Sequence, residues 1–118
     1  MGPAGFPRAA RLTTPDEFSQ AFRDGRRSSD ACFAVYARPC GAGARLGLAV
    51  AKKAVASAAA RARIKRLVRE SFRLNRAYLP GVDIVVQARG TAAKRDNGEL
   101  RASLDWHWQE VIKRCKAS

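Results

Sequence analysis

The sequence predicts a single α+β domain in which three helices pack on a three-stranded sheet, in the element order αββαβα. Its length of 118 residues suits one hydrophobic core rather than two. Short runs of β-forming residues alternate with segments of helical periodicity, and no linker or internal repeat divides the chain. We therefore expect a sandwich over residues 12–116, preceded by a mobile basic arm over residues 1–11.

The first helix is expected to begin after Thr14. Threonine is a good N-cap, Pro15 suits the first helical position, and Glu17 completes a capping box. Gly25 is a natural place for the helix to end. Its apolar stripe would consist of Phe18, Ala21 and Phe22.

Two strands are expected next. Residues 26–30 are polar and predict a turn, residues 32–37 predict a strand, residues 39–43 a second turn, and residues 45–52 a second strand. One face of that second strand would hold Leu46, Leu48 and Val50. The other face has only Gly47, Ala49 and Ala51, so a helix could pack closely on it.

A strongly basic helix is expected over residues 58–76, where Glu70 is the only acidic residue. Its apolar side, at helical spacing, consists of Ile64, Leu67, Val68, Ser71 and Phe72. Its cations are Arg61, Arg63, Lys65, Arg66, Arg69, Arg73 and Arg76. Like charges at this spacing repel one another, and a bound polyanion would relieve that repulsion.

The last two elements are a strand over residues 82–88 and a helix that follows a polar loop over residues 89–98. The central apolar run of the strand favours an interior position in the sheet. Periodicity places Trp108 in the core and Trp106 on the surface. The core-facing side of the helix would comprise Leu100, Leu104, Trp108, Val111, Ile112 and Cys115.

Composition favours a nucleic-acid-binding protein, because 23 basic residues against 10 acidic ones give a net charge of +13. The three cysteines, Cys32, Cys40 and Cys115, are widely spaced and only one histidine is present, so we expect reduced thiols and no metal site. No apolar run is long enough for a membrane span or a secretory signal. We expect a cytoplasmic protein that is monomeric without RNA.

Few side chains in this sequence could perform hydrolysis. General acid–base cleavage of RNA needs two groups that titrate near neutrality on either side of a phosphate. His107 is the only histidine and lies beside the core-facing stripe, so we expect it to be a packing or surface residue. Asp16 and Glu17 are explained by the start of the first helix, and no acidic metal-binding cluster is present. We therefore predict no catalytic residue in the protein.

Four segments together resemble the protein subunit of bacterial ribonuclease P. They are Arg11-Leu12 with the following FSQAF (18–22), FAVY (33–36), RLGLAVAKK (45–53) and RARIKRLVRE (61–70). The resemblance spans about residues 11 to 115. The chain departs from the family pattern at Ala62, where the family has asparagine between two arginines, and an alanine side chain cannot form the hydrogen bonds of an amide.

The resemblance implies a fold like that of the second domain of ribosomal protein S5, with a left-handed βαβ crossover. It also implies that a catalytic RNA hydrolyses precursor tRNA with Mg²⁺, while the protein binds that RNA and the 5′ leader of the precursor. The RNA-binding residues would be Arg11, Arg45, Lys52, Lys53, Arg61, Arg63, Lys65, Arg66, Arg69 and Arg73. The leader cleft would contain Phe18, Phe22, Phe33 and Tyr36.

Two other classes stay open. A ribosomal or RNA-chaperone protein would share the size and charge but would not need the aromatic cleft. A DNA-binding regulator would place the basic helix in a major groove, but the charged positions of this helix lack the Asn and Gln that read adenine.

Overall fold

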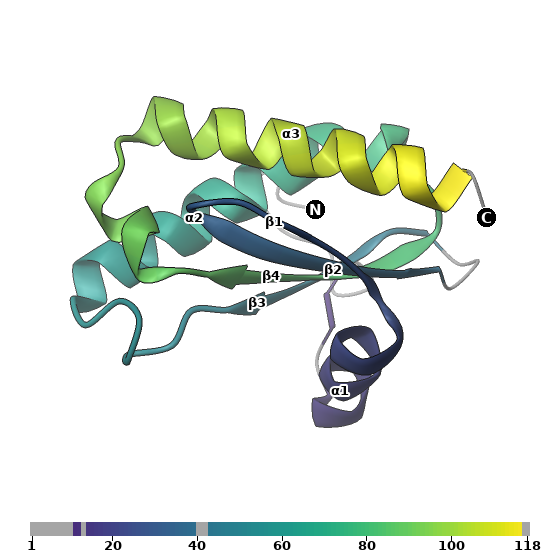
Figure 1. Ribbon diagram of the computed structural model, residues 1–118, viewed down its shortest axis with the longest axis horizontal. Coiled ribbons are helices and arrows are strands. Elements are labelled where there is room, and N and C mark those ends of the chain that lie inside the picture. Colours follow the sequence, from purple (N-terminus) through teal and green to yellow (C-terminus); the bar gives the residue numbers. More distant parts are fainter. Residues whose placement is uncertain (1–10, 13, 40–42, 117–118) are drawn as a thin grey trace, which may run out of the picture.

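The computed structural model describes residues 11–12, 14–39 and 43–116 (Figure 1). Its helices are α1 (Pro15–Asp24), α2 (Ala58–Asn75) and α3 (Asn97–Lys116), and its strands are β1 (Arg26–Ser29), β2 (Phe33–Pro39), β3 (Arg45–Ala49) and β4 (Val82–Ala88). Two short 3-10 helices, η2 (Arg76–Tyr78) and η3 (Gly90–Lys94), follow α2 and β4. The expected basic arm lies outside the described residues, except for Arg11 at its end.

The strands of the described residues form one mixed sheet in the order β1, β2, β4, β3. β2 runs antiparallel to both neighbours, whereas β3 and β4 are parallel and are connected through α2. The predicted α+β class is confirmed. The left hand of the crossover through α2 stays an expectation from the resemblance.

The prediction of a turn at residues 26–30 is wrong, because β1 adds a fourth strand to the predicted three. β1 pairs with β2 from Arg26 opposite Ala37 to Ser29 opposite Ala34. It lies at the edge of the sheet and buries only Ser28. A strand with a single buried serine has no alternating apolar pattern, so its sequence resembles a polar turn.

The sheet separates a large helical layer from a small one. Figure 1 shows α2 and α3 over one face and α1 against the other. The main core lies between the sheet and α2 with α3, and Trp108 is fully buried there while Trp106 is 44% exposed, as predicted. Its largest buried side chains are Trp108, Phe33, Phe72, Ile64, Ile84, Leu100 and Leu104.

The start and the end of α1 follow from local chemistry. The Thr14 hydroxyl accepts the Glu17 N–H at 3.2 Å, and the Glu17 carboxylate accepts the Thr14 N–H at 3.1 Å, which confirms the capping box. The helix ends before Gly25, whose N–H donates to the carbonyl of Ala21. A Cβ atom at position 25 would lie 2.3 Å from that carbonyl oxygen, so only glycine fits here.

Phe18 of α1 packs on the small-residue face of β3, while the helix as a whole lies mainly against β2 and β4. A Cβ atom on Gly47 would lie 2.7 Å from two ring atoms of Phe18, so the aromatic ring rests directly on the glycine backbone. Leu12, Ala21 and Val85 form a small cluster on this face, with Phe18 and Tyr36 packed against it. The absence of a side chain at position 47 therefore sets the depth at which α1 sits.

A buried polar network fastens β1 to α3. The Nδ1 atom of His107 lies 2.8 Å from the Ser28 hydroxyl, and its Nε2 atom lies 3.3 Å from Asp30 Oδ1 without hydrogen-bond alignment. Asp30 in turn accepts the hydroxyl of Ser103 from α3. His107 is 0% exposed, which confirms that it is a packing residue; the arrangement of serine, histidine and aspartate is sealed from any substrate.

The protonation states of this network follow from its surroundings. Burial lowers the pKa of His107 below its usual 6.5, and Asp30 and Glu110 offset this only in part. Burial raises the pKa of Asp30, but hydrogen bonds from Ser103 and from two backbone N–H groups outweigh it and leave that pKa below 3.8. A neutral histidine beside a charged aspartate is the state that these shifts favour at pH 7.

We expect Gly47→Ala to destabilise the protein by about 1–3 kcal/mol, because the new methyl group forces the Phe18 ring away from β3. Gly43→Ala is the matched control, since the nearest atom to its Cβ would be the flexible Arg76 Nη2 at 3.7 Å. Urea unfolding of both variants measures the difference. Equal stabilities would show that α1 is not seated by this contact.

The pKa of His107 predicts the direction of a pH effect on stability. Because the folded protein binds this proton more weakly than the unfolded chain, the stabilisation is present above pH 6.5 and is lost as the pH falls below that value. We expect His107→Gln to flatten the decline in unfolding free energy just below pH 6.5. The Asp30 contribution is lost only below 3.8, so the two windows separate. Parallel pH curves for variant and parent would contradict this assignment.

Candidate nucleic-acid interface

The core packing of α2 determines which of its charges face outward. Ser57 caps the helix by accepting the Ala60 N–H at 3.2 Å. The buried side chains are those that the periodicity predicts, namely Ile64, Leu67, Val68, Ser71 and Phe72. Trp108 also donates from its indole N–H to the Ser71 hydroxyl at 2.7 Å, which locks this row against α3. The charged positions must then lie on the remaining surface.

Three of the predicted cations of α2, Arg66, Arg69 and Arg73, are exposed, and Lys65 is half-buried. None of these four takes part in an ion pair among the described residues. Ala62, which replaces the family's asparagine, is also exposed on this helix. This side of α2 is a surface of unneutralised positive charge.

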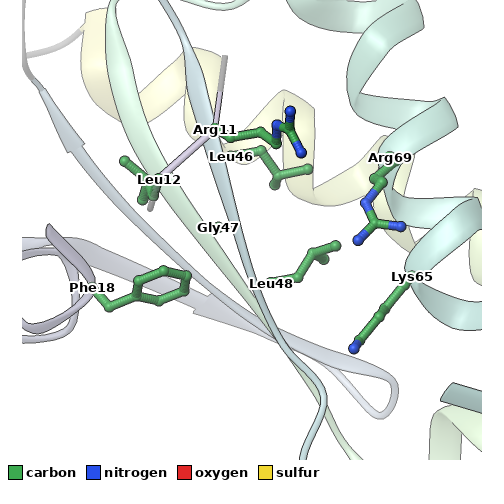
Figure 2. A pocket seen from close by; sticks show the side chains of 8 residues that line it. All are labelled: Arg11, Leu12, Phe18, Leu46, Gly47, Leu48, Lys65 and Arg69. Carbon is green, nitrogen blue, oxygen red and sulfur yellow. The ribbon is translucent and has the colours of Figure 1, made fainter. Parts of the chain in front are cut away.

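A hollow of about 190 Å³ lies where α2 approaches the outer edge of β3. Figure 2 shows Lys65 and Arg69 reaching toward it from α2, with Phe18 on the far side and Arg11 above. Arg11 is brought there because the backbone N–H of Leu12 donates to the carbonyl of Leu46 at 2.9 Å. Three cations thus surround a floor made of Leu12, Phe18, Leu46, Gly47 and Leu48.

Two predicted RNA-binding arginines near the start of α2 are engaged within the fold instead. Arg61 donates from Nη1 to the carbonyls of Val55 at 2.9 Å and Ala56 at 2.8 Å. Arg63 donates to the Asn97 side chain at 2.8 Å and to a carbonyl of η3. Both are half-buried. Their described contacts hold the connector before α2 and the start of α3.

Arg45, also predicted to bind RNA, lies in a cluster of ion pairs on the α1 side of the sheet. Its Nε and Nη2 donate to the Asp83 carboxylate at 2.8 and 2.9 Å, and its Nη1 donates to Glu17 at 2.8 Å. The hydrogen bond to Asp83 raises the pKa of Arg45 above its usual value. Arg38 lies 3.8 Å from Asp83, so two cations and two carboxylates balance. The cluster ties α1 to β3 and β4.

The remaining predicted cations lie at both ends of the basic surface. Arg73 and Arg76 border a second hollow of about 430 Å³ near Ala44, whose carbonyl accepts the Arg76 Nε–H at 3.2 Å. Lys52 and Lys53 are exposed in the turn after β3.

Three of the four aromatic residues predicted for the leader cleft, Phe18, Phe22 and Tyr36, lie on the α1 side of the sheet. Phe18 covers Gly47, and the rings of Phe22 and Tyr36 meet edge to face with centroids 4.8 Å apart. Phe22 is 38% exposed and Tyr36 is half-buried. The prediction for Phe33 is wrong, because this ring is 0% exposed on the opposite face of the sheet, in the core with α2 and α3. Alternation along a strand already puts residues 33 and 36 on opposite faces, so Phe33 could not share a face with Tyr36.

One arginine near this cleft was missed. Arg27 lies opposite Tyr36 in the pairing of β1 with β2, and its Cζ lies 5.9 Å from the Tyr36 ring centroid. Its position follows once residues 26–29 are recognised as a strand. The sequence gives no such signal, because β1 lacks an apolar side.

Other kinds of site find little support in the described part of the chain. No group of three or more His, Cys, Asp or Glu side chains there could hold a metal ion. Cys32 is a buried free thiol whose pKa is raised by burial. No helix among the described residues combines the length and apolarity of a membrane span.

Comparison with known proteins identifies the family. The family model described as ribonuclease P matches residues 6–112. The ribonuclease P protein component of Thioalkalivibrio sulfidiphilus is 47% identical, with 94% of this chain and 93% of the relative covered. That of Methylococcus capsulatus is 48% identical, with 97% and 90% covered.

Solved structures agree with the sequence relatives. The ribonuclease P protein of Staphylococcus aureus superposes with a TM-score of 0.79 at 29% identity, covering 92% of this chain and 97% of that one. The Thermotoga maritima protein gives a TM-score of 0.76 at 32% identity, covering 86% and 96%. The chain belongs to the ribonuclease P protein family.

Proposed function

We propose that this member of the ribonuclease P protein family binds the catalytic RNA of that ribonucleoprotein and the 5′ leader of precursor tRNA. In this role it assists the Mg²⁺-dependent endonucleolytic removal of the leader, which forms the mature 5′ end. The observation that carries the proposal is the row of cations on α2 that have no ion pair among the described residues, beside a hollow that Phe18 borders.

The exposed side of α2 suits a folded RNA. Arg66, Arg69 and Arg73 follow one another at spacings of three and four residues, so they lie along one side of the helix. Without a ligand these like charges repel, and RNA phosphates relieve the repulsion while counterions are released. Binding of this kind reads the shape and charge of the RNA rather than its sequence.

The face of the sheet that carries α1 suits a single strand. Unpaired bases bind sequence-independently to aromatic rings in a positively charged groove, because every base has a stacking face. Here the Phe22 ring of α1 contacts the Tyr36 ring of β2. Phe18, also on α1, borders the hollow that Lys65 and Arg69 reach. A strand crossing α1 toward α2 would meet rings first and cations next.

The chemistry is assigned to the RNA and its Mg²⁺ ions. The only histidine of the chain is enclosed between β1 and α3, where Ser28 and Asp30 already surround its two ring nitrogens. Glu17 and Asp83 are paired with Arg45, and Arg38 lies near Asp83 as well. The protein contributes positive charge and stacking surfaces, which favour the bound precursor.

A reconstitution tests the proposal. We expect the protein to accelerate 5′ cleavage of precursor tRNA by a bacterial ribonuclease P RNA at low Mg²⁺, and we expect no cleavage by the protein without RNA. Labelled precursor resolved on gels measures both. Leader removal by RNA-free protein would contradict the division of labour, and a lack of any effect on the RNA would contradict the subunit role.

The role of α2 is tested by salt dependence. We expect the double substitution Arg66→Gln and Arg69→Gln to reduce the log–log salt slope of RNA binding by about one to two units. Arg101→Gln is the matched control, because it removes an exposed charge from α3 beside Glu70 and Asp105. Filter binding from low to high salt measures the slopes. The same slope in the double variant as in the parent would remove this side of α2 from the interface.

A further inference from the structure

The exposed edge strand β1 places a planar cation over the aromatic pair of Tyr36 and Phe22. The guanidinium of Arg27 lies over the Tyr36 ring, with its Cζ 5.9 Å from the ring centroid. The Tyr36 ring also meets the Phe22 ring edge to face, with centroids 4.8 Å apart and an interplanar angle of 69°. Arg27 is exposed while Tyr36 is half-buried beneath it. The outermost flat group at this point is therefore a guanidinium rather than a phenol ring.

The backbone of β1 is held in place by the end of α3. Nη1 of Arg114 donates to the carbonyl of Arg27, and Nη1 of Arg26 donates to the carbonyl of Arg114 at 2.9 Å. Arg114 is itself oriented by Glu110, 3.3 Å away. These contacts use the main chain of Arg27 and the side chains of its neighbours. They leave the Arg27 guanidinium on the cleft side, and no ion pair within the described residues involves it.

We infer that Arg27 is a stacking residue for single-stranded RNA, with its guanidinium sandwiched between Tyr36 and a base of the bound strand. A guanidinium plane stacks on aromatic faces and on bases, and its edge donates hydrogen bonds to a neighbouring phosphate. This inference rests on the proposed function, since the strand in question is the 5′ leader. It extends the cleft from α1 across β1.

The competing explanation is that Arg27 adds only charge to an already basic protein. The substitution Arg27→Lys distinguishes stacking from charge alone. An ammonium group keeps the positive charge but has no planar group to stack and no pair of parallel N–H donors. Arg23 provides a matched control on α1, since its side chain is 70% exposed and lies 3.7 Å from Asp24. Its replacement removes one nearby charge that has no ring contact among the described residues.

The experiment uses the complete ribonucleoprotein, assembled from catalytic RNA and protein, with precursor tRNAs that have either a long leader or a single leader nucleotide. Parent, Arg27→Ala, Arg27→Lys and Arg23→Ala are compared by precursor affinity, and melting of each free protein confirms folding. We expect Arg27→Ala and Arg27→Lys to weaken long-leader binding about five- to tenfold, as expected for losing one stacked base, and to leave short-leader binding unchanged. Arg23→Ala should change either affinity less than twofold.

Each alternative outcome is distinct. Parent-like affinity of Arg27→Lys would overturn stacking in favour of charge alone, and equal losses for Arg23→Ala and Arg27→Ala would do the same. An equal loss of affinity for long-leader and short-leader precursors would show that Arg27 contacts RNA outside the leader, and it would overturn the inference. If the parent itself did not distinguish the two leaders, the proposed leader contact would fail, whatever the variants showed.

Discussion

The packing of α2 against the sheet is the constraint on which the rest of this structure depends. Once Ile64, Leu67, Val68 and Phe72 are buried, the rotation of the helix is fixed, and Arg66 and Arg69 have no position except the surface. The same packing sets the helix beside β3, so that Lys65 and Arg69 meet the hollow that Phe18 borders. A row of apolar side chains thereby determines where the nucleic-acid-binding charge lies.

A count of basic residues does not show where that charge is free to bind, because the arginines of the described residues have different partners. Arg61 and Arg63 hydrogen-bond to backbone and amide oxygens, and Arg45 is neutralised by Glu17 and Asp83. Exposed cations such as Arg66 have no ion pair among the described residues. Arginine suits such hydrogen bonds and ion pairs because its planar fork satisfies several acceptors in fixed directions. The net charge of the chain indicates that its ligand is a nucleic acid. The hydrogen-bond and ion-pair partners of each arginine indicate which of them are available to bind that ligand.

The sequence predicts correctly those features that depend on residues within a few positions of one another. The capping box at Thr14, the buried row of α2 and the opposite placements of Trp106 and Trp108 follow from spacing alone. β1 could not be predicted, because an edge strand that buries a single serine owes its pairing to β2 and its anchoring to α3. The core position of Phe33 could have been predicted, because its spacing of three residues from Tyr36 puts the two rings on opposite faces of β2. The described partners of Arg61 lie within six residues, yet basic patterning gave no sign of them.

The attachment of β1 to α3 has a consequence for the order of folding. Ser28 meets His107 and Arg27 meets Arg114, at sequence separations of 79 and 87 residues, and β2 itself needs β4 as a neighbour. A two-stranded hairpin of β1 and β2 is marginal alone in water. The edge strand β1 is therefore held by segments that are made late, since β4 and α3 both follow residue 81. The aromatic residues of α1 and β2 come early in the chain, yet the strand beside them depends on contacts from the last helix.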